Sequence, residues 1–320
     1  MTTESQTTIA AALEGAAYAE EHSAGRILMR GRDRAALLQR ISTNDMLRLR
    51  PGQGARTVLT TPIGRIIDLL IVHALDDALL VVTSPEQGGA VWSHLKKNIF
   101  FQDQVTLEAA GRAYAQLALY GPAAADVLAG ALSVAARDLP PHHTAGAFGE
   151  LIVAARPPIG GPSFTLYIPA AQVPDVQAAL ESAGAVGLDP AALDVLRVER
   201  GYPAFGRELS QEYIPLETGL HDAVSFTKGC YVGQEIIARM ESRGRLAKQL
   251  RGLRLSAPAT APAKLEVGGK EAGDLTSAVI SPRLGPIALA YVRTAHAEPG
   301  TRVGIAGADM TGEVVELPMV

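Results

Sequence analysis

Two stretches of this chain repeat one order of strand and helix signals, and this repeat constrains the fold more than any other feature. Hydrophobic alternation in the first stretch predicts the order β-α-β-β-β-α. We expect its strands at residues 26–29, 57–60, 66–73 and 78–83, and its helices at residues 32–41 and 85–97. A weaker copy follows, with strands at residues 116–119, 151–155 and 164–168 and helices after Gly121-Pro122 and at residues 173–182. Such repeats, without the long buried runs of a parallel sheet, favour two related α+β parts of ferredoxin-like type.

The last quarter of the chain has a different pattern. Short strand-like runs separated by Gly and Pro are typical of a small β-barrel. They lie at residues 249–255, 265–267, 273–281, 287–292, 302–306 and 312–316. The predicted fold class is therefore α+β, with two ferredoxin-like parts and a C-terminal small β-barrel. We divide the chain into a partly flexible N-terminal segment (1–23), a first part (24–110), a second part (111–244) and the barrel (245–320).

Charge and cysteine content exclude several classes of function. With 320 residues and a net charge of −4, the chain gives no global electrostatic reason to bind nucleic acid or an anionic membrane. The most apolar stretch, residues 66–82, is interrupted by Asp68, Asp76 and Asp77, so no membrane span is expected. One cysteine cannot form an intramolecular disulfide, and the first residues lack the basic and apolar regions of a signal peptide. We expect a cytoplasmic protein.

The single cysteine, Cys230, marks the first candidate site for chemistry. It lies on a glycine-rich segment two residues after Lys228, and a helix is predicted from Gln234 onward. A nearby cation or a helix N-terminus lowers the pKa of a thiol and so favours the reactive thiolate. The alternative is a small, buried, apolar cysteine in a turn.

The segment Lys228-Gly229-Cys230-Tyr231-Val232-Gly233-Gln234-Glu235 resembles the signature octet of the YgfZ-type folate-binding proteins, which are relatives of the glycine-cleavage T-protein. Supporting matches lie at residues 43–45, 64–68, 197–203, 206–209, 214–217, 224–227, 273–277 and 288–292. The resemblance implies a tetrahydrofolate-binding fold, in which two α+β parts and a barrel surround a central cavity. It also implies a role in assembly or repair of iron–sulfur clusters, with client or assembly proteins as partners, and places Cys230 and Lys228 at the rim of the site as catalytic candidates.

The resemblance also tests a transferase function. The T-protein has two consecutive aspartates where this chain has Asp68-Leu69, and its catalytic aspartate aligns with Leu69. Leucine cannot accept a proton, and a positioned acid or base usually contributes about 10²–10⁴-fold to a rate. A register slip of one residue would instead turn Asp68 into the pocket, because neighbouring strand residues point to opposite faces. Asp68 is therefore kept as a candidate folate contact.

Four further residues are candidate folate contacts. Glu199 aligns with the T-protein glutamate that holds the pterin ring, and a carboxylate can accept two adjacent N–H donors of a pterin. The alternative for Glu199 is an exposed helix carboxylate paired with a neighbouring arginine. Tyr202 and Tyr231 are candidate stacking partners, with core packing as the alternative. Gln234 is the fourth candidate, within the octet.

A basic run follows the octet and stands against Glu241 alone. Its members are Arg239, Arg243, Arg245, Lys248, Arg251 and Arg254. The run suits a folate glutamate tail, a phosphate-bearing partner or RNA, whereas the alternative is a charged strand edge that blocks unwanted pairing. The histidines are dispersed and one thiol cannot complete an iron–sulfur ligand set, so no metal site is predicted.

Three hypotheses for function remain open. The first is a tetrahydrofolate-binding accessory protein of iron–sulfur cluster assembly or repair. The second is a folate-dependent aminomethyl or methyl transferase, or a demethylase, that uses Asp68. The third is a folate-binding module linked to tRNA modification through the basic run.

Overall fold

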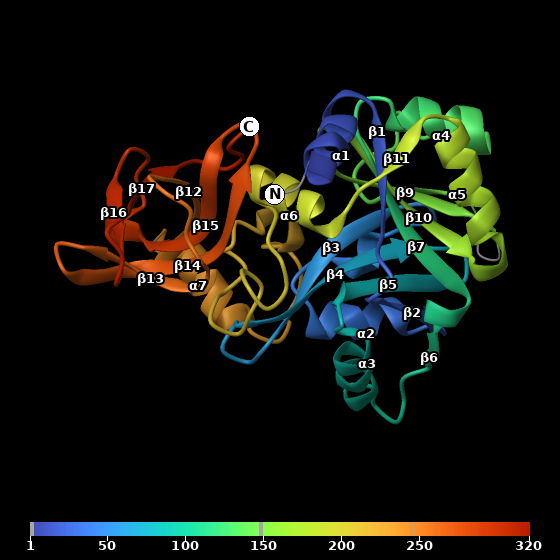
Figure 1. Cartoon of the computed structure of the whole chain (residues 1–320). Helices are drawn as coiled ribbons and strands as arrows, with labels where there is room; N and C mark the ends of the chain where they lie inside the picture. The colour runs from blue at the N-terminus through green and yellow to red at the C-terminus, as the bar shows by residue number, and fades with distance from the viewer. Residues whose placement is uncertain (1–2, 147–149, 245) are drawn as a thin grey trace.

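The computed structural model describes residues 3–146, 150–244 and 246–320. Two sheets covered by helices lie beside a closed barrel of short strands, with helix α6 (Pro190–Arg200) and a long loop between them (Figure 1). The predicted α+β fold class with a C-terminal barrel is confirmed.

The first sheet is antiparallel, in the order β3-β4-β5-β2-β6. Its strands are β2 (Ala24–Arg30), β3 (Gly54–Thr60), β4 (Ile66–Ala74), β5 (Ala78–Pro85) and β6 (Thr106–Ala109). Helices α2 (Arg34–Ile41) and α3 (Gly88–Lys97) cover one face, where Leu37 and Leu95 pack with Leu70 and Val72 of β4. Apart from the added edge strand β3, the order β2-α2-β4-β5-α3-β6 is that of a ferredoxin-like unit.

The second sheet copies this arrangement with one added strand, β1 (Ala16–Glu20), in the order β11-β1-β7-β10-β9-β8. Its later strands are β7 (Tyr114–Tyr120), β8 (Thr144–Ala145), β9 (Ile152–Ile159), β10 (Gly161–Pro169) and β11 (Ala185–Gly187). Helices α4 (Ala124–Leu132) and α5 (Val173–Ser182) correspond to α2 and α3. The repeat read from the sequence therefore corresponds to two similar layers.

The N-terminal segment, predicted to be separate and partly flexible, lies within this second layer over its described residues. It forms α1 (Thr3–Glu14) and β1 (Ala16–Glu20), and β1 pairs with β7 on one side and β11 on the other. Ala16, Ala17 and Ala19 are buried. A short alanine-rich run carries little strand propensity, so pairing with its neighbours determines its conformation.

Beyond α6, residues 201–233 form an irregular loop with the short 3-10 helix η4 (His221–Ala223), followed by α7 (Gln234–Arg243). The barrel closes in the order β12-β15-β14-β13-β16-β17. Its strands are β12 (Lys248–Leu255), β13 (Ala263–Val267), β14 (Lys270–Ser281), β15 (Gly285–Arg293), β16 (Arg302–Ile305) and β17 (Thr311–Val315). The remaining 3-10 turns are η1 (Met46–Arg48), η2 (Ala110–Arg112), η3 (Ala170–Gln172) and η5 (Thr294–His296).

Within the described part of the chain, every helix is too short or too polar to cross a membrane.

Candidate functional site

Helix α6 delivers Glu199 to the boundary between the second sheet and the barrel. Asp189 caps the helix N-terminus, since its carboxylate accepts hydrogen bonds from the N–H groups of Ala191 and Ala192, both at 2.9 Å. The helix ends at Gly201, which has a left-handed backbone (φ +74°) that favours glycine. Glu199, in the last turn, is fully buried.

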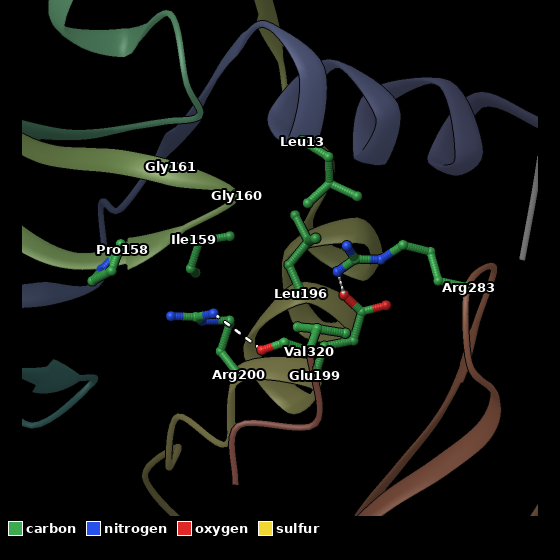
Figure 2. A pocket seen from close by; sticks show the side chains of 10 residues that line it. All are labelled: Leu13, Pro158, Ile159, Gly160, Gly161, Leu196, Glu199, Arg200, Arg283 and Val320. Carbon is green, nitrogen blue, oxygen red and sulfur yellow. Dashed lines mark hydrogen bonds and ion pairs between the residues drawn. The ribbon is translucent and has the colours of Figure 1, made fainter.

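Two groups from the barrel bind the Glu199 carboxylate. The Ser281 hydroxyl donates to its Oε1 at 2.5 Å, and the Arg283 guanidinium forms an ion pair with its Oε2. Arg283 extends from the β14–β15 turn toward α6 (Figure 2). The alternative of an exposed Glu199 paired with a neighbouring arginine is therefore wrong.

Two cavities flank the end of α6. The first, here called the Glu199 cavity, has a volume of about 330 Å³. Its apolar wall comes from α1, α6 and the β9–β10 hairpin, and its polar wall consists of Glu199, Arg200 and Arg283 (Figure 2). The second, here called the junction cavity, measures about 470 Å³ and is lined by all three parts of the fold. Arg200 lines both cavities, and its buried Nε has no hydrogen-bond partner among the described residues.

The junction cavity has a cationic lining. Arg56 comes from the first sheet, Arg200 from α6 and Arg251 from the barrel, while Glu316 is the one acidic residue among the described residues that line the cavity. Arg56 pairs with Asp222 at 2.5 Å, and Arg251 donates to the Ala297 carbonyl at 3.0 Å. Tyr202 also lines this cavity. The arrangement suits a ligand that combines a planar ring with carboxylates.

Asp68 and Leu69 lie on opposite faces of β4. Leu69 is opposite Val58 and packs in a cluster with Val198 of α6 and Leu250 of the barrel. Asp68 is opposite Leu59, which belongs to the helix-covered face, and is fully buried. The register slip that would turn Asp68 toward the site is therefore absent, and this geometry does not support Asp68 as a folate contact.

The buried Asp68 predicts a pH-dependent stability. Its carboxylate accepts hydrogen bonds from the N–H groups of Leu69 and Ser84 at 2.9 and 3.2 Å, yet burial raises its pKa from 3.8 to about 6. The folded state therefore binds more protons than the unfolded state between about pH 4 and 6, and stability falls as pH rises through this window. Two pKa units correspond to roughly 3 kcal/mol.

Denaturant unfolding at pH 4 and pH 6.5 measures this contribution. Between these two pH values the free energy of unfolding should fall in the wild-type chain and in the exposed control Asp126→Asn. It should not fall in this way in Asp68→Asn. Equal pH dependence in all three would contradict a raised pKa.

The octet packs against the β3–β4 turn. Gly233 adopts φ +86°, and a Cβ there would lie 2.7 Å from Thr60 Oγ1, so this position requires glycine. Thr60 Oγ1 donates to the Val232 carbonyl at 2.6 Å. The predicted helix from Gln234 is confirmed as α7.

Within the octet, the thiol and the ammonium occupy different environments. Cys230 is exposed, so the alternative of a buried apolar cysteine is wrong. The Nζ of Lys228 is buried, donates to the carbonyls of Ser42 and Asn44 at 2.7 Å each, and lies 4.9 Å from the Tyr231 ring centroid. Burial lowers the Lys228 pKa to about 8.

The structure thus brings only some of the predicted residues together. Glu199 and Tyr202 line adjoining cavities at the end of α6. Tyr231 packs with Leu216, Val224 and Ile237, as in its core alternative, and Gln234 is half-buried at the start of α7. Neither cavity is lined by residues of the octet.

The described members of the basic run form no continuous stripe. Arg239 pairs with Glu235, and Lys248 pairs with Asp274. Arg251 lines the junction cavity, whereas Arg254 is exposed on the same strand. Arg245 and the side chain of Arg243 lie outside what the structure describes.

Glu208 is a buried site residue whose role the sequence reasoning missed. It accepts hydrogen bonds from Arg197 (3.2 Å), the Ala204 N–H (3.0 Å), and the hydroxyls of Thr276 and Ser277 (2.6 Å each). This network joins α6 to strand β14 and supports the end of the helix that carries Glu199. Glu208 stood within a matched motif, but nothing in its spacing revealed partners some 70 residues away.

Family models match nearly the whole chain. Residues 2–228 match the GCVT N-terminal domain, and residues 248–320 match the glycine cleavage T-protein C-terminal barrel domain. The chain belongs to the glycine-cleavage T-protein family.

Individual relatives extend this result. The chain is 33% identical in sequence to a chloroplastic protein of Arabidopsis thaliana that carries the provisional name of a transferase. The match covers 92% of this chain and 69% of the relative. An aminomethyltransferase of Halothermothrix orenii is 31% identical over 92% of this chain and 86% of its own, and one of Rubrobacter xylanophilus is 34% identical over 92% and 80%. The crystal structure of glycine cleavage system aminomethyltransferase T from Bartonella henselae superposes on this chain with a TM-score of 0.90 at 23% sequence identity. The superposition covers 99% of this chain and 89% of that one, so the two share a fold.

Proposed function

We propose that this chain binds a reduced folate at the end of α6, and that it acts as an accessory protein in assembly or repair of iron–sulfur clusters. The observation that carries folate binding is the junction cavity, where three arginines from three parts of the fold surround about 470 Å³ of space. Membership of the T-protein family, whose relatives include aminomethyltransferases, supports the same ligand.

The residues at the two cavities fit a folate in chemical character. Glu199 would hold the donor edge of the pterin, and Tyr202 offers an aromatic face. Arg56, Arg200 and Arg251 would hold the carboxylates of the glutamate tail. A bound folate would supply a carrier for one-carbon units.

Leu69 distinguishes this chain from an ordinary aminomethyl transferase in our proposal. It faces α6 and the barrel at the position where the resemblance places the catalytic carboxylate. Without a proton acceptor there, transfer would lose a factor of about 10²–10⁴. The YgfZ-like octet instead supports the iron–sulfur role, with the exposed Cys230 as the reactive group and Lys228 as the residue that holds its loop against the segment after α2.

Complementation of cells that lack the protein tests this role. Cys230→Ala, shown to be folded by its unfolding transition, should lose most of the restored iron–sulfur enzyme activity, whereas Ser242→Ala on the neighbouring helix α7 should retain it. Full restoration by folded Cys230→Ala would refute a role for the thiol.

A folate-dependent aminomethyl or methyl transferase or demethylase is the second candidate, favoured by the names of the relatives. The contacts of the basic run add no support for tRNA modification, and a cytoplasmic location stays a prediction.

A further inference from the structure

The Glu199 carboxylate needs strong hydrogen-bond donors where it lies. It is fully buried, and it belongs to the last turn of α6, where the helix dipole disfavours negative charge. Ser281 supplies one neutral hydrogen bond, and Arg283 supplies the only positive charge that contacts this carboxylate among the described residues. The free chain therefore satisfies Glu199 internally.

Arg283 is held less firmly than the other arginine that binds a buried glutamate nearby. Arg197 is 12% exposed and donates to Asp194, Glu208, Ser277 and a backbone carbonyl. The Arg283 side chain is 39% exposed and has Glu199 as its one hydrogen-bonding partner among the described residues. Moving the Arg283 side chain therefore breaks one ion pair among the described residues, and the Glu199 cavity beside it has about 330 Å³ of space.

The guanidinium group and a pterin edge present the same pattern to a carboxylate. Both offer adjacent N–H donors in one plane, so the two compete for the same oxygens. We propose that Arg283 is an internal competitor of the pterin, which occupies Glu199 in the free chain and must be displaced by any ligand that binds this carboxylate. The proposal rests on the folate binding proposed above and adds a residue that sets its affinity.

Displacement has a measurable consequence. A wild-type complex forms only after the Arg283–Glu199 pair is broken, whereas Arg283→Ser leaves the buried carboxylate without a cation and ready to accept ligand donors. We expect Arg283→Ser to bind tetrahydrofolate and unsubstituted pterin about 10- to 100-fold more tightly than the wild-type chain does, which corresponds to roughly 1.4–2.8 kcal/mol.

Calorimetric titration of the full chain with three probes tests the proposal. The probes are tetrahydrofolate, pterin without a tail, and p-aminobenzoylglutamate, which has the tail but no pterin. Arg293→Ala is the matched control, because Arg293 lies at the end of β15 in an exposed pair with Glu271. The expected result is tighter binding of the first two probes by Arg283→Ser alone, with p-aminobenzoylglutamate unchanged. Detectable pterin binding by Arg283→Ser alone would also support competition.

The opposing outcomes separate this proposal from the proposed function. Equal affinities of the wild-type chain and Arg283→Ser for tetrahydrofolate would overturn the competitor role and leave folate binding intact. Absence of binding by both would overturn folate binding and the competitor role together. If Arg283→Ser does not fold, Arg283→Gln keeps one donor to Glu199 and should show a smaller gain in the same direction. A gain for all three probes alike would identify a general structural effect and contradict competition.

Discussion

Replacing Glu208 by alanine is expected to lower the free energy of unfolding by about 3–5 kcal/mol, the range for removing one partner from a buried ion pair. Glu208 is fully buried and accepts four hydrogen bonds from α6, the following loop and β14. Its removal leaves the Arg197 cation, which is only 12% exposed, without its buried carboxylate. The boundary between α6 and the barrel should therefore weaken.

Denaturant unfolding followed by circular dichroism measures this loss. Glu208→Gln keeps an acceptor and should fall between the wild-type chain and Glu208→Ala. Glu235→Ala is the control, because Glu235 is 83% exposed in an i,i+4 pair and should change stability by less than about 0.5 kcal/mol. A Glu208→Ala loss no larger than this control would contradict the structural role of the network.

Introducing a carboxylate at position 69 is expected to raise one-carbon transfer to tetrahydrofolate by about 10²–10⁴-fold over the wild-type chain. Leu69 lies on the face of β4 that packs against α6 and the barrel, so an aspartate there would point toward the end of α6, as Asp68 does not. Leu69→Asn is the control, because asparagine has nearly the shape of aspartate and adds polarity but no carboxylate to accept a proton.

Single-turnover formation of one-carbon-loaded tetrahydrofolate from an aminomethyl donor provides the rates, and unfolding curves establish that both variants are folded. Equal rates for Leu69→Asp and Leu69→Asn would show that a missing carboxylate does not limit transfer. A fast wild-type chain would favour the transferase function over the accessory role.

Periodicity predicted the parts of this fold that local patterns determine. The alternation along β4 placed Leu69 and Asp68 on opposite faces, and the recurring strands and helices indicated two ferredoxin-like layers. Strand β1 escaped prediction because alanine carries little strand preference, so its conformation depends on β7 and β11.

The site was less accessible to sequence reasoning because its partners are distant in the chain. Ser281 and Arg283 contact Glu199 across more than 80 residues, so its burial had no local signal. Arg56 had no motif around it, and Arg251 appeared only as one member of a basic run. Exposure of Cys230 likewise depends on how the octet lies against the β3–β4 turn.

Calorimetric titration with tetrahydrofolate tests the central claim, folate binding at the junction cavity. Arg251→Met removes a cavity arginine, and Arg254→Met is its matched control on the same strand, because Arg254 is exposed and points to the opposite face. A charged hydrogen bond is worth about 1.5–3 kcal/mol, so Arg251→Met should bind at least about tenfold more weakly than the wild-type chain, with Arg254→Met unchanged. No binding by the wild-type chain, or equal affinities of the two variants, would contradict folate binding in this cavity.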